Sequence, residues 1–463
     1  MVAGISLQGE GKMRDIYLIE YAVRGIKSLD EWVELSFYKK TFTRPFNIKR
    51  YNVKGIYGLN GTGKSAIITS VDLLKGIVLD SSYLYNPINQ KNLTELVNKK
   101  LGKLDYRLKF LVIINNKLIL YNYELTIWKD HTDKYAIKRE LLSYRYATSK
   151  NDVFTVLFET ENDNIINYIN NDDYLSFLME QTKNLLTHAS LSRLALEKTS
   201  QKLKKGSEHS PLQMGLVFHF LFISSLYVYM ENADDHTEFL LFDLLHKQDD
   251  TSDTDTIERI LDHLPVKSDV QLYRLSPGKM IIPKNQYDIL KKQVCKLKNF
   301  LKIFKSDIVD IQIDRRDYKD CYQCELILEY DEYSVNAEFE STGIKKLISI
   351  FAYLQKVVQG DIVFIDEMDS NLHDVYLCAL LEYLMEYGNG QLCFTTHNIG
   401  PMDILKRNKK SIEFLSVDHH IHSWTTNGNY SPSKLYKNGM IDGSPFNISA
   451  IDFLSIFESE EDE

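Results

Sequence analysis

One eight-residue motif limits what this chain can fold into more than any other feature. Residues 58–65 read GLNGTGKS and fit the pattern G-x-x-x-x-G-K-[ST]. They follow an apolar run at Val53–Tyr57, which predicts a strand, and they precede a helix expected at Ser65–Leu79. Glycines in such a loop let successive backbone N–H groups turn toward phosphate oxygens, and the helix N-terminus adds its positive dipole. The motif therefore predicts a P-loop (Walker A).

Each polar residue of this loop has an expected partner on a nucleotide. Lys64 is expected to reach the β- and γ-phosphates, and the hydroxyl of Ser65 to bind Mg²⁺. The nucleotide-binding residues of the loop are then Gly58, Asn60, Gly61, Thr62, Gly63, Lys64 and Ser65.

Two carboxylates end a second apolar run. Ile362–Ile365 predicts a buried strand, and Asp366 and Glu367 follow it directly. Two adjacent carboxylates are usually surface charges, but at the end of an apolar strand in a chain with a P-loop they predict a Walker B pair. Asp366 would then hold the Mg²⁺ shell, and Glu367 would polarise the attacking water as general base.

Two further segments could contact phosphate. His397 follows a strand expected at Leu392–Thr395 and could contact the γ-phosphate or the attacking water. Ser341 and Gly343 come just before a helix expected at Ile344–Val358, where a serine and a glycine can form a second phosphate-binding cap.

The order of these motifs resembles the ABC-type ATPase heads of the RecF and SMC group. The motifs are G-x-N-G-x-G-K-S, S-x-G, an apolar strand ending in Asp-Glu, and T-H-N. They are most similar to the standalone AAA/ABC-like ATPases related to the OLD (overcoming lysogenization defect) proteins. Val23–Leu29 (VRGIKSL) is also similar to the N-F-R-G-I-K opening of that family, with Ala22-Val23 in place of Asn-Phe. The resemblance covers about residues 14–130 and 306–425.

The resemblance implies that two subunits share each nucleotide. Ser341 and Gly343 would contact the γ-phosphate bound by the P-loop of a second subunit, so ATP and Mg²⁺ would be sandwiched in a head-to-tail homodimer or a higher homo-oligomer. Asp369 matches the D-loop position, and His397 matches the switch histidine.

Two features depart from the family pattern. Leu372-His373-Asp374 stands where a His-Pro is frequent after the D-loop. Neither Gln90 nor Gln181 is convincing as the Q-loop glutamine, so that residue stays unassigned.

The fold class expected from these features is α/β. It comprises an ABC-type ATPase head, with a P-loop mixed sheet and flanking helices, interrupted by a mainly helical insertion lobe. Residues 14–130 would form the N-terminal half of the head, 131–305 the insertion, and 306–463 the C-terminal half with an acidic tail at Glu458–Glu463. Leu108–Ile127 predicts a hairpin, and alternating helices and buried strands after residue 344 predict a parallel sheet. Lys247–Thr256 predicts an exposed acidic loop.

Composition narrows the class of protein further. The chain has 463 residues and a formal charge of −9, which does not favour a protein that binds nucleic acid non-specifically. Five cysteines are too few and too odd in number for a disulfide framework. The apolar run Met214–Met230 contains His219 and two serines and predicts a buried helix. With no visible secretory signal, the chain is expected to be cytoplasmic, without a membrane partner.

Three other classes of site or protein are disfavoured. Cys321 and Cys324 have zinc-hook spacing but no heptads around them, so we interpret them as ordinary thiols on a strand edge. Asp418–His422 (DHHIH) has no partner at fixed spacing and predicts a surface turn. The segment E-S-T-G differs from the transporter motif L-S-G-G-Q, which sets a transporter ATPase aside.

The leading functional hypothesis is an ATPase that serves as the sensor or scaffold subunit of an antiphage defence system, as in PARIS and Septu. Only 66 residues follow His397 (463 − 397), too few for the TOPRIM nuclease domain of an OLD protein. A separate effector, a TOPRIM or other nuclease or a toxin, and a phage-encoded trigger would be its partners.

Two alternatives remain open. The first is a RecF-like repair or recombination ATPase that clamps DNA, with lysines of the helix expected at 287–304 and Lys406–Lys410 along the groove. The simpler interpretation of those lysines is a solvated helix face. The second is a scaffold that binds ATP and barely hydrolyses it.

Overall fold

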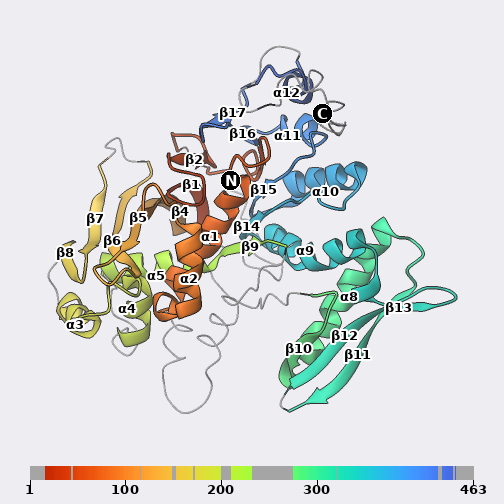
Figure 1. Ribbon diagram of the computed structural model, residues 1–463, viewed down its shortest axis with the longest axis horizontal. Helices are drawn as coiled ribbons and strands as arrows, with labels where there is room; N and C mark the ends of the chain where they lie inside the picture. Colours follow the sequence, from red (N-terminus) through yellow and green to blue (C-terminus); the bar gives the residue numbers. More distant parts are fainter. Residues whose placement is uncertain are drawn as a thin grey trace, which may run out of the picture.

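Three sheets carry the fold. The computed structural model describes residues 16–42, 45–114, 116–148, 153–169, 173–199, 210–231, 275–319, 321–425, 430–441 and 444. Figure 1 shows a seven-stranded sheet on one side, a six-stranded sheet through the middle and a smaller four-stranded sheet on the other side. This mixed α/β architecture agrees with the expected fold class at that level.

The six-stranded sheet carries the P-loop. Its order is β17-β16-β3-β15-β14-β9, and the five strands from β16 to β9 run parallel. Parallel strands covered on both faces are mostly apolar, which is why short apolar runs predicted β3, β14 and β15. In sheet order, the strands are Ile421–Ser423, Ile412–Leu415, Val53–Tyr57, Gln391–Thr395, Ile362–Ile365 and Leu226–Tyr229.

Helices cover both faces of this sheet because successive residues of a strand point to opposite sides. Ile362 and Phe364 belong to one apolar core together with helices α1 and α5. Val363 and Ile365 belong to a second core with helices α9, α10 and α11. These helices span Lys64–Leu79 (α1), Pro211–Ser224 (α5), Thr342–Gln359 (α9), Asp374–Tyr387 (α10) and Met402–Leu405 (α11).

The seven-stranded sheet is antiparallel, in the order β2-β1-β4-β5-β6-β7-β8. The expected hairpin is confirmed as β4 and β5, joined by a turn in which Asn116 has a φ of +62°. The strands, in sheet order, are Val33–Ser36, Ile16–Arg24, Lys103–Ile114, Lys117–Lys129, Tyr135–Tyr146, Thr155–Glu161 and Asn164–Tyr168.

The third sheet holds β12 between β10 and β11, and β13 also pairs with β12. Helix α8, expected at 287–304, packs on this sheet through a buried stripe of Leu290, Val294, Leu297 and Leu301, which recur at spacings of three and four residues. Strand β13 is short, because a 3₁₀ turn, η4, follows it directly. The bounds are Met280–Pro283 (β10), Tyr287–Phe304 (α8), Asp310–Tyr318 (β11), Cys321–Glu329 (β12), Ser334–Asn336 (β13) and Ala337–Phe339 (η4).

The remaining helical elements connect these sheets or lie beside them. They are η1 (Tyr83–Tyr85), α2 (Pro87–Leu96), α3 (Asp173–Thr182), α4 (Leu191–Thr199), η3 (Lys284–Gln286) and α12 (Pro432–Lys437).

The Cys-x-x-Cys pair lies inside a sheet, so its expected place on a strand edge is wrong. Cys321 and Cys324 are on β12, which pairs with β10 on one side and β11 on the other. The edge is covered because β10 comes from an earlier part of the chain that the local pattern does not reveal. Both thiols are free, and no cluster of three or more metal-ligating side chains occurs among the described residues.

The described part of 131–305 contains more strand than expected, and a separate helical lobe is not confirmed. Strands β6, β7 and β8 extend the seven-stranded sheet, and the run Met214–Met230 divides into buried helix α5 and strand β9 of the parallel sheet. Hydrophobicity identified this run as buried but could not show that it changes conformation at Ser225.

Lys247–Thr256 and the tail Glu458–Glu463 lie outside the described residues. Within those residues, no helix is both long and apolar enough to cross a membrane.

His219 of α5 makes the stability of this core depend on pH. It is fully buried, its ring centroid is 3.9 Å from that of Tyr123, and its Nδ1 is 2.5 Å from Oγ of Ser192. Burial lowers the pKa of His219 from 6.5 to about 3, so between these values the unfolded chain binds a proton that the folded chain does not. We expect the unfolding free energy to fall by about 2 kcal/mol from pH 7 to pH 5 through this histidine alone.

Urea unfolding of the wild type and of His219→Phe at these two pH values tests this effect. The variant should lose about 2 kcal/mol less than the wild type over this range, whatever its stability at pH 7. A variant of exposed His420, His420→Asn, should keep the wild-type pH dependence. Equal losses in all three proteins would contradict the assignment.

Candidate nucleotide site

The P-loop joins the end of β3 to the first turn of α1. Gly63 has a φ of +103°, and a Cβ there would lie 2.5 Å from a methyl group of Leu29, so only glycine fits. The ammonium of Lys64 donates hydrogen bonds to the carbonyls of Gly58 (2.8 Å) and Leu59 (2.9 Å). Burial lowers the pKa of Lys64, although nearby carboxylates oppose the shift. The loop thus holds a buried cation within its own turn.

The acidic pair lies at the same edge of the sheet, two strands from the P-loop. Asp366 and Glu367 directly follow β14, and β15 runs between β14 and β3. The hydroxyl of Thr395, at the end of β15, donates to Oδ1 of Asp366 (2.5 Å) and accepts from the backbone N–H of Glu367 (2.8 Å). Carboxyl ends of parallel strands share an edge, so these side chains meet where a nucleotide on the P-loop would present its phosphates.

Glu367 has a strained backbone. Its φ of +47° is in the left-handed region, which an unbranched non-glycine residue adopts only at a cost of about 1–3 kcal/mol. The hydrogen bond from its N–H to Thr395 helps to hold this conformation. Such strain is concentrated at functional sites, where the surrounding structure over-determines it.

Asp369 ties the segment after Glu367 to the segment after β15. Its Oδ2 accepts hydrogen bonds from the backbone N–H groups of His397 (3.3 Å) and Asn398 (3.1 Å). Its Oδ1 is buried and has no hydrogen-bond partner among the described residues. The His397 side chain is exposed, and its backbone is tied through Asp369 to the segment that follows the Asp366–Glu367 pair.

The start of α9 lies against the segment that follows Asp369. Ser341 caps the helix by accepting a hydrogen bond from the N–H of Ile344 (3.4 Å). A Cβ on Gly343 would lie 2.7 Å from the carbonyl oxygen of Asn371, so this close approach requires glycine. The structure therefore brings the Ser341–Gly343 cap and the Asp369 segment together in one chain.

Glu340 anchors this cap. It accepts hydrogen bonds from the Tyr330 hydroxyl and from the Ser341 N–H (3.1 Å), and Lys305 lies 3.5 Å away. Burial alone would raise the pKa of Glu340, but these donors lower it overall. The ionised carboxylate thus fixes the loop that leads into α9.

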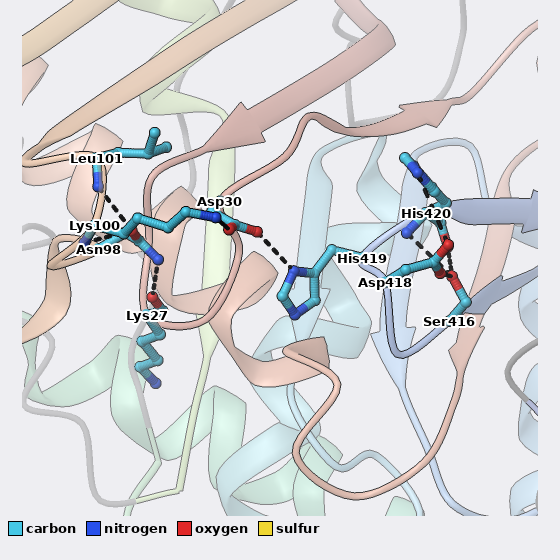
Figure 2. Close-up of polar contacts among 9 residues, drawn as sticks. All are labelled: Lys27, Asp30, Asn98, Lys100, Leu101, Ser416, Asp418, His419 and His420. Atoms are coloured by element: carbon cyan, nitrogen blue, oxygen red, sulfur yellow. Dashed lines mark hydrogen bonds and ion pairs between the residues drawn. The ribbon is translucent and has the colours of Figure 1, made fainter.

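Two further segments approach glycines of the P-loop. Leu29 contacts Gly63, and a Cβ on Gly58 would lie 2.5 Å from the carbonyl oxygen of Leu415. Figure 2 shows the loops fastened to each other: the His419 ring lies 3.1 Å from Asp30, and Lys100 donates to the same carboxylate at 2.7 Å. The bonds from Lys100 and then His419 lower the pKa of Asp30 to about 2.

The Val23–Leu29 segment and the Asp418–His422 turn therefore both belong to the surroundings of the P-loop. Lys27, in the first segment, donates to Thr69 of α1 (3.3 Å). The turn expected at Asp418–His422 is confirmed as far as His420, whereas Ile421 and His422 belong to β17. No local signal predicted that these two segments would meet.

The departures from the family pattern have structural explanations. His373 is the N-cap of α10 and accepts from the N–H of Val375 (3.3 Å). Gln90 is occupied elsewhere, because its amide bonds both the N–H and the carbonyl of Tyr135. Gln181 lies in α3, so neither glutamine is brought to the P-loop by a described contact.

The lysines of α8 are exposed or, for Lys298, partly exposed, as on a solvated helix face. Lys291 pairs with Asp288 (2.8 Å) and Lys298 with Asp310 (3.1 Å). These pairs offset part of the positive charge that a DNA groove would need, so the structure adds no observation in favour of the DNA-clamp alternative.

Two residues at this edge, Thr395 and Lys346, were not predicted from the sequence. The sequence predicts Thr395 only as the last residue of an apolar strand. In the structure, its hydroxyl donates to the Asp366 carboxylate and accepts from the backbone N–H of Glu367. Lys346 follows another lysine in the first turns of α9 and reads as surface, but it is buried among aromatic and apolar groups. The available signal was that Lys346 occupies a position of α9 whose neighbours four and seven residues later are apolar.

Comparisons with known proteins add little. No family model matches the chain, and no curated protein matches its sequence. Among solved structures, the chain is similar to the Smc head domain with a coiled coil and joint from Pyrococcus yayanosii, at 12% sequence identity and a TM-score of 0.37. The matched region covers 89% of this chain and 97% of the Smc chain. This degree of similarity establishes neither a shared fold nor a shared activity.

Proposed function

We propose that this chain is an ABC-type ATPase that binds and hydrolyses ATP. One observation carries the proposal: the P-loop, the Asp366–Glu367 pair and the His397 segment follow three adjacent parallel strands, β3, β14 and β15, at one edge of a sheet. Backbone N–H groups and Lys64 can bind phosphates, and a carboxylate within reach can activate water.

The division of roles follows from the chemistry of each group. Lys64 exchanges its bonds to the loop carbonyls for bonds to the β- and γ-phosphates. Glu367 takes the proton from the attacking water, and His397 contacts the γ-phosphate.

Mg²⁺ fits the donors at this edge, because it prefers oxygen ligands such as the Ser65 hydroxyl and the Asp366 carboxylate. The buried, unpaired Oδ1 of Asp369 is a further oxygen that a hydrated cation could satisfy. When bound, Mg²⁺ would neutralise charge on the β- and γ-phosphates.

ATP turnover by the purified full-length chain, with and without Mg²⁺, tests the proposed activity. We expect Mg²⁺-dependent release of phosphate that Lys64→Ala abolishes. Phosphate release that is the same in Lys64→Ala and in the wild type would come from a contaminant and would contradict the proposal.

Ser341→Arg tests the proposed ATP-sandwiched dimer. The added side chain would project from the exposed cap of α9, where a second subunit would present its γ-phosphate. We expect Ser341→Arg to change the ATP affinity of the monomer less than about threefold. When Ser341→Arg is combined with Glu367→Gln, light scattering should no longer detect the ATP-dependent dimer. Ser341→Ala removes the hydroxyl without adding bulk, so it should cost about 1 kcal/mol of stability through the lost helix cap and should weaken the dimer less than Ser341→Arg does. ATP-dependent dimers of Ser341→Arg would contradict this role.

We further propose that the ATPase is the sensor or scaffold subunit of an antiphage defence system that controls a separate effector nuclease or toxin. The support is the motif order and its resemblance to the OLD-related ATPases. Affinity purification of Glu367→Gln from its native host with ATP and Mg²⁺ tests this role. A stoichiometric second protein would support it, whereas DNA alone would favour a RecF-like repair ATPase.

A further inference from the structure

Two lysines of α9 lie on two tyrosines of β9, but they have different partners. The Lys356 ammonium is 4.7 Å from the ring centroid of Tyr227 and 3.6 Å from the Asp361 carboxylate. The Lys346 ammonium is 4.6 Å from the ring centroid of Tyr229 and has no hydrogen-bond partner among the described residues. Lys346 is only 4% exposed, so water has little access to hydrogen-bond its ammonium.

A buried ammonium needs compensating charge, because its desolvation costs several kcal/mol. Burial lowers the pKa of Lys346, and the negative charges of four carboxylates oppose that shift: Glu231, Glu367, Asp366 and Asp369. The last three also oppose the lowering of the Lys64 pKa by burial. The acidic group at the end of β14 therefore interacts with one lysine from the P-loop and another from α9.

The backbone places Tyr229, whose ring lies under the Lys346 ammonium, beside the acidic pair. Strand β9 pairs with β14, and the N–H of Asp366 donates to the carbonyl of Tyr229 (2.9 Å). Tyr229 therefore contacts both groups: its ring lies under the Lys346 ammonium, and its carbonyl accepts the backbone hydrogen bond of Asp366. Lys356 lies farther along α9, at the opposite end of β14, where Asp361 precedes the strand.

We propose that Lys346 is a positioning residue for the hydrolysis reaction, holding the Asp366, Glu367 and Asp369 carboxylates in place through its positive charge. The proposal rests on the proposed ATPase function. Because α9 also carries Ser341 and Gly343 one turn earlier, the same rigid element would present the cap to a second subunit and the cation to its own carboxylates. Lys346 does not reach the P-loop itself, so its charge should matter for turnover more than for ATP binding.

Three variants separate positioning from packing. Lys346→Met keeps the length of the side chain and removes its charge, Lys346→Arg keeps the charge, and Lys356→Met removes the matched buried lysine at the other end of β14. Each is measured for affinity of a fluorescent ATP analogue, for kcat and KM, and for thermal midpoint. The wild type and Lys64→Ala are measured alongside.

We expect Lys346→Met to lower kcat by about 10- to 100-fold, with KM and analogue affinity within about threefold of the wild type. Its thermal midpoint should not fall, because an apolar side chain can replace a buried, unpaired charge without loss of stability. Lys346→Arg should recover at least about a third of the wild-type kcat. Lys356→Met should unfold at a lower temperature with kcat unchanged.

The outcomes distinguish this proposal from the proposed function. A wild type without Lys64-dependent hydrolysis would overturn the ATPase proposal and, with it, this one. Hydrolysis by the wild type together with a normal kcat in Lys346→Met would overturn only the role of Lys346. The same conclusion follows if Lys356→Met loses as much kcat, or if Lys346→Met loses analogue affinity instead of kcat.

Discussion

Lys64→Ala is expected to weaken ATP binding by at least about 100-fold, which corresponds to about 3 kcal/mol. The ammonium is buried in the P-loop, where it donates two hydrogen bonds, so a phosphate that took their place would bind a largely desolvated cation. Charge-assisted hydrogen bonds in such surroundings are about twice as strong as neutral ones. Isothermal titration with ATP and Mg²⁺ would measure the loss.

Lys99→Ala is the control for this experiment. The Lys99 side chain is 64% exposed and pairs with Glu95 (3.7 Å), so its removal should leave ATP affinity unchanged. A thermal scan of Lys64→Ala would show that the loop without its ammonium still allows folding. Near-wild-type ATP affinity in a folded Lys64→Ala protein would exclude this loop as the phosphate site.

Glu367→Gln is expected to bind ATP as the wild type does and to lower kcat by at least about 100-fold. Glutamine keeps the shape of the side chain and the backbone bond to Thr395, but it cannot accept the proton of the attacking water. ATP should therefore persist, and ATP-bound dimers should accumulate. Phosphate release and light scattering on the same sample would measure both effects.

Glu382→Gln provides a matched control on the neighbouring helix α10, where this glutamate pairs with Arg407 (2.7 Å) on the surface. It should leave both kcat and the oligomeric state unchanged. A Glu367→Gln protein with normal turnover would mean that another group is the general base. Equal loss of ATP binding in Lys64→Ala and Glu367→Gln would contradict the separation of binding from hydrolysis.

Much of the local structure could be predicted because it depends on neighbours in the chain. Apolar runs bounded by glycine or by charge predicted β3 and β14 at their observed limits, and predicted β15 to within one residue. The helical stripe of α8 was equally local. At the site, the motifs correctly indicated which residues follow each strand, although their roles on a nucleotide remain proposals.

The order of strands was not available from local patterns. His397 comes one strand after the acidic pair along the chain, yet β15 lies between β14 and β3 in the sheet. Strand pairing depends on long-range hydrogen bonds and packing, so the position of Thr395 between the two functional strands emerged only from the fold. The same applies to β10, which covers the edge where the cysteines were expected.

The sequence alone determined that a P-loop and an acidic pair each follow an apolar strand, since backbone freedom at glycine and the length of an apolar run are properties of consecutive residues. Tertiary structure decided which lysines are surface charges and which are buried. Lys345 and Lys346 are adjacent and chemically identical, but only Lys346 is packed between α9 and β9, facing the carboxylates. Burial and the charge that compensates for it depend on segments that meet only when the chain folds.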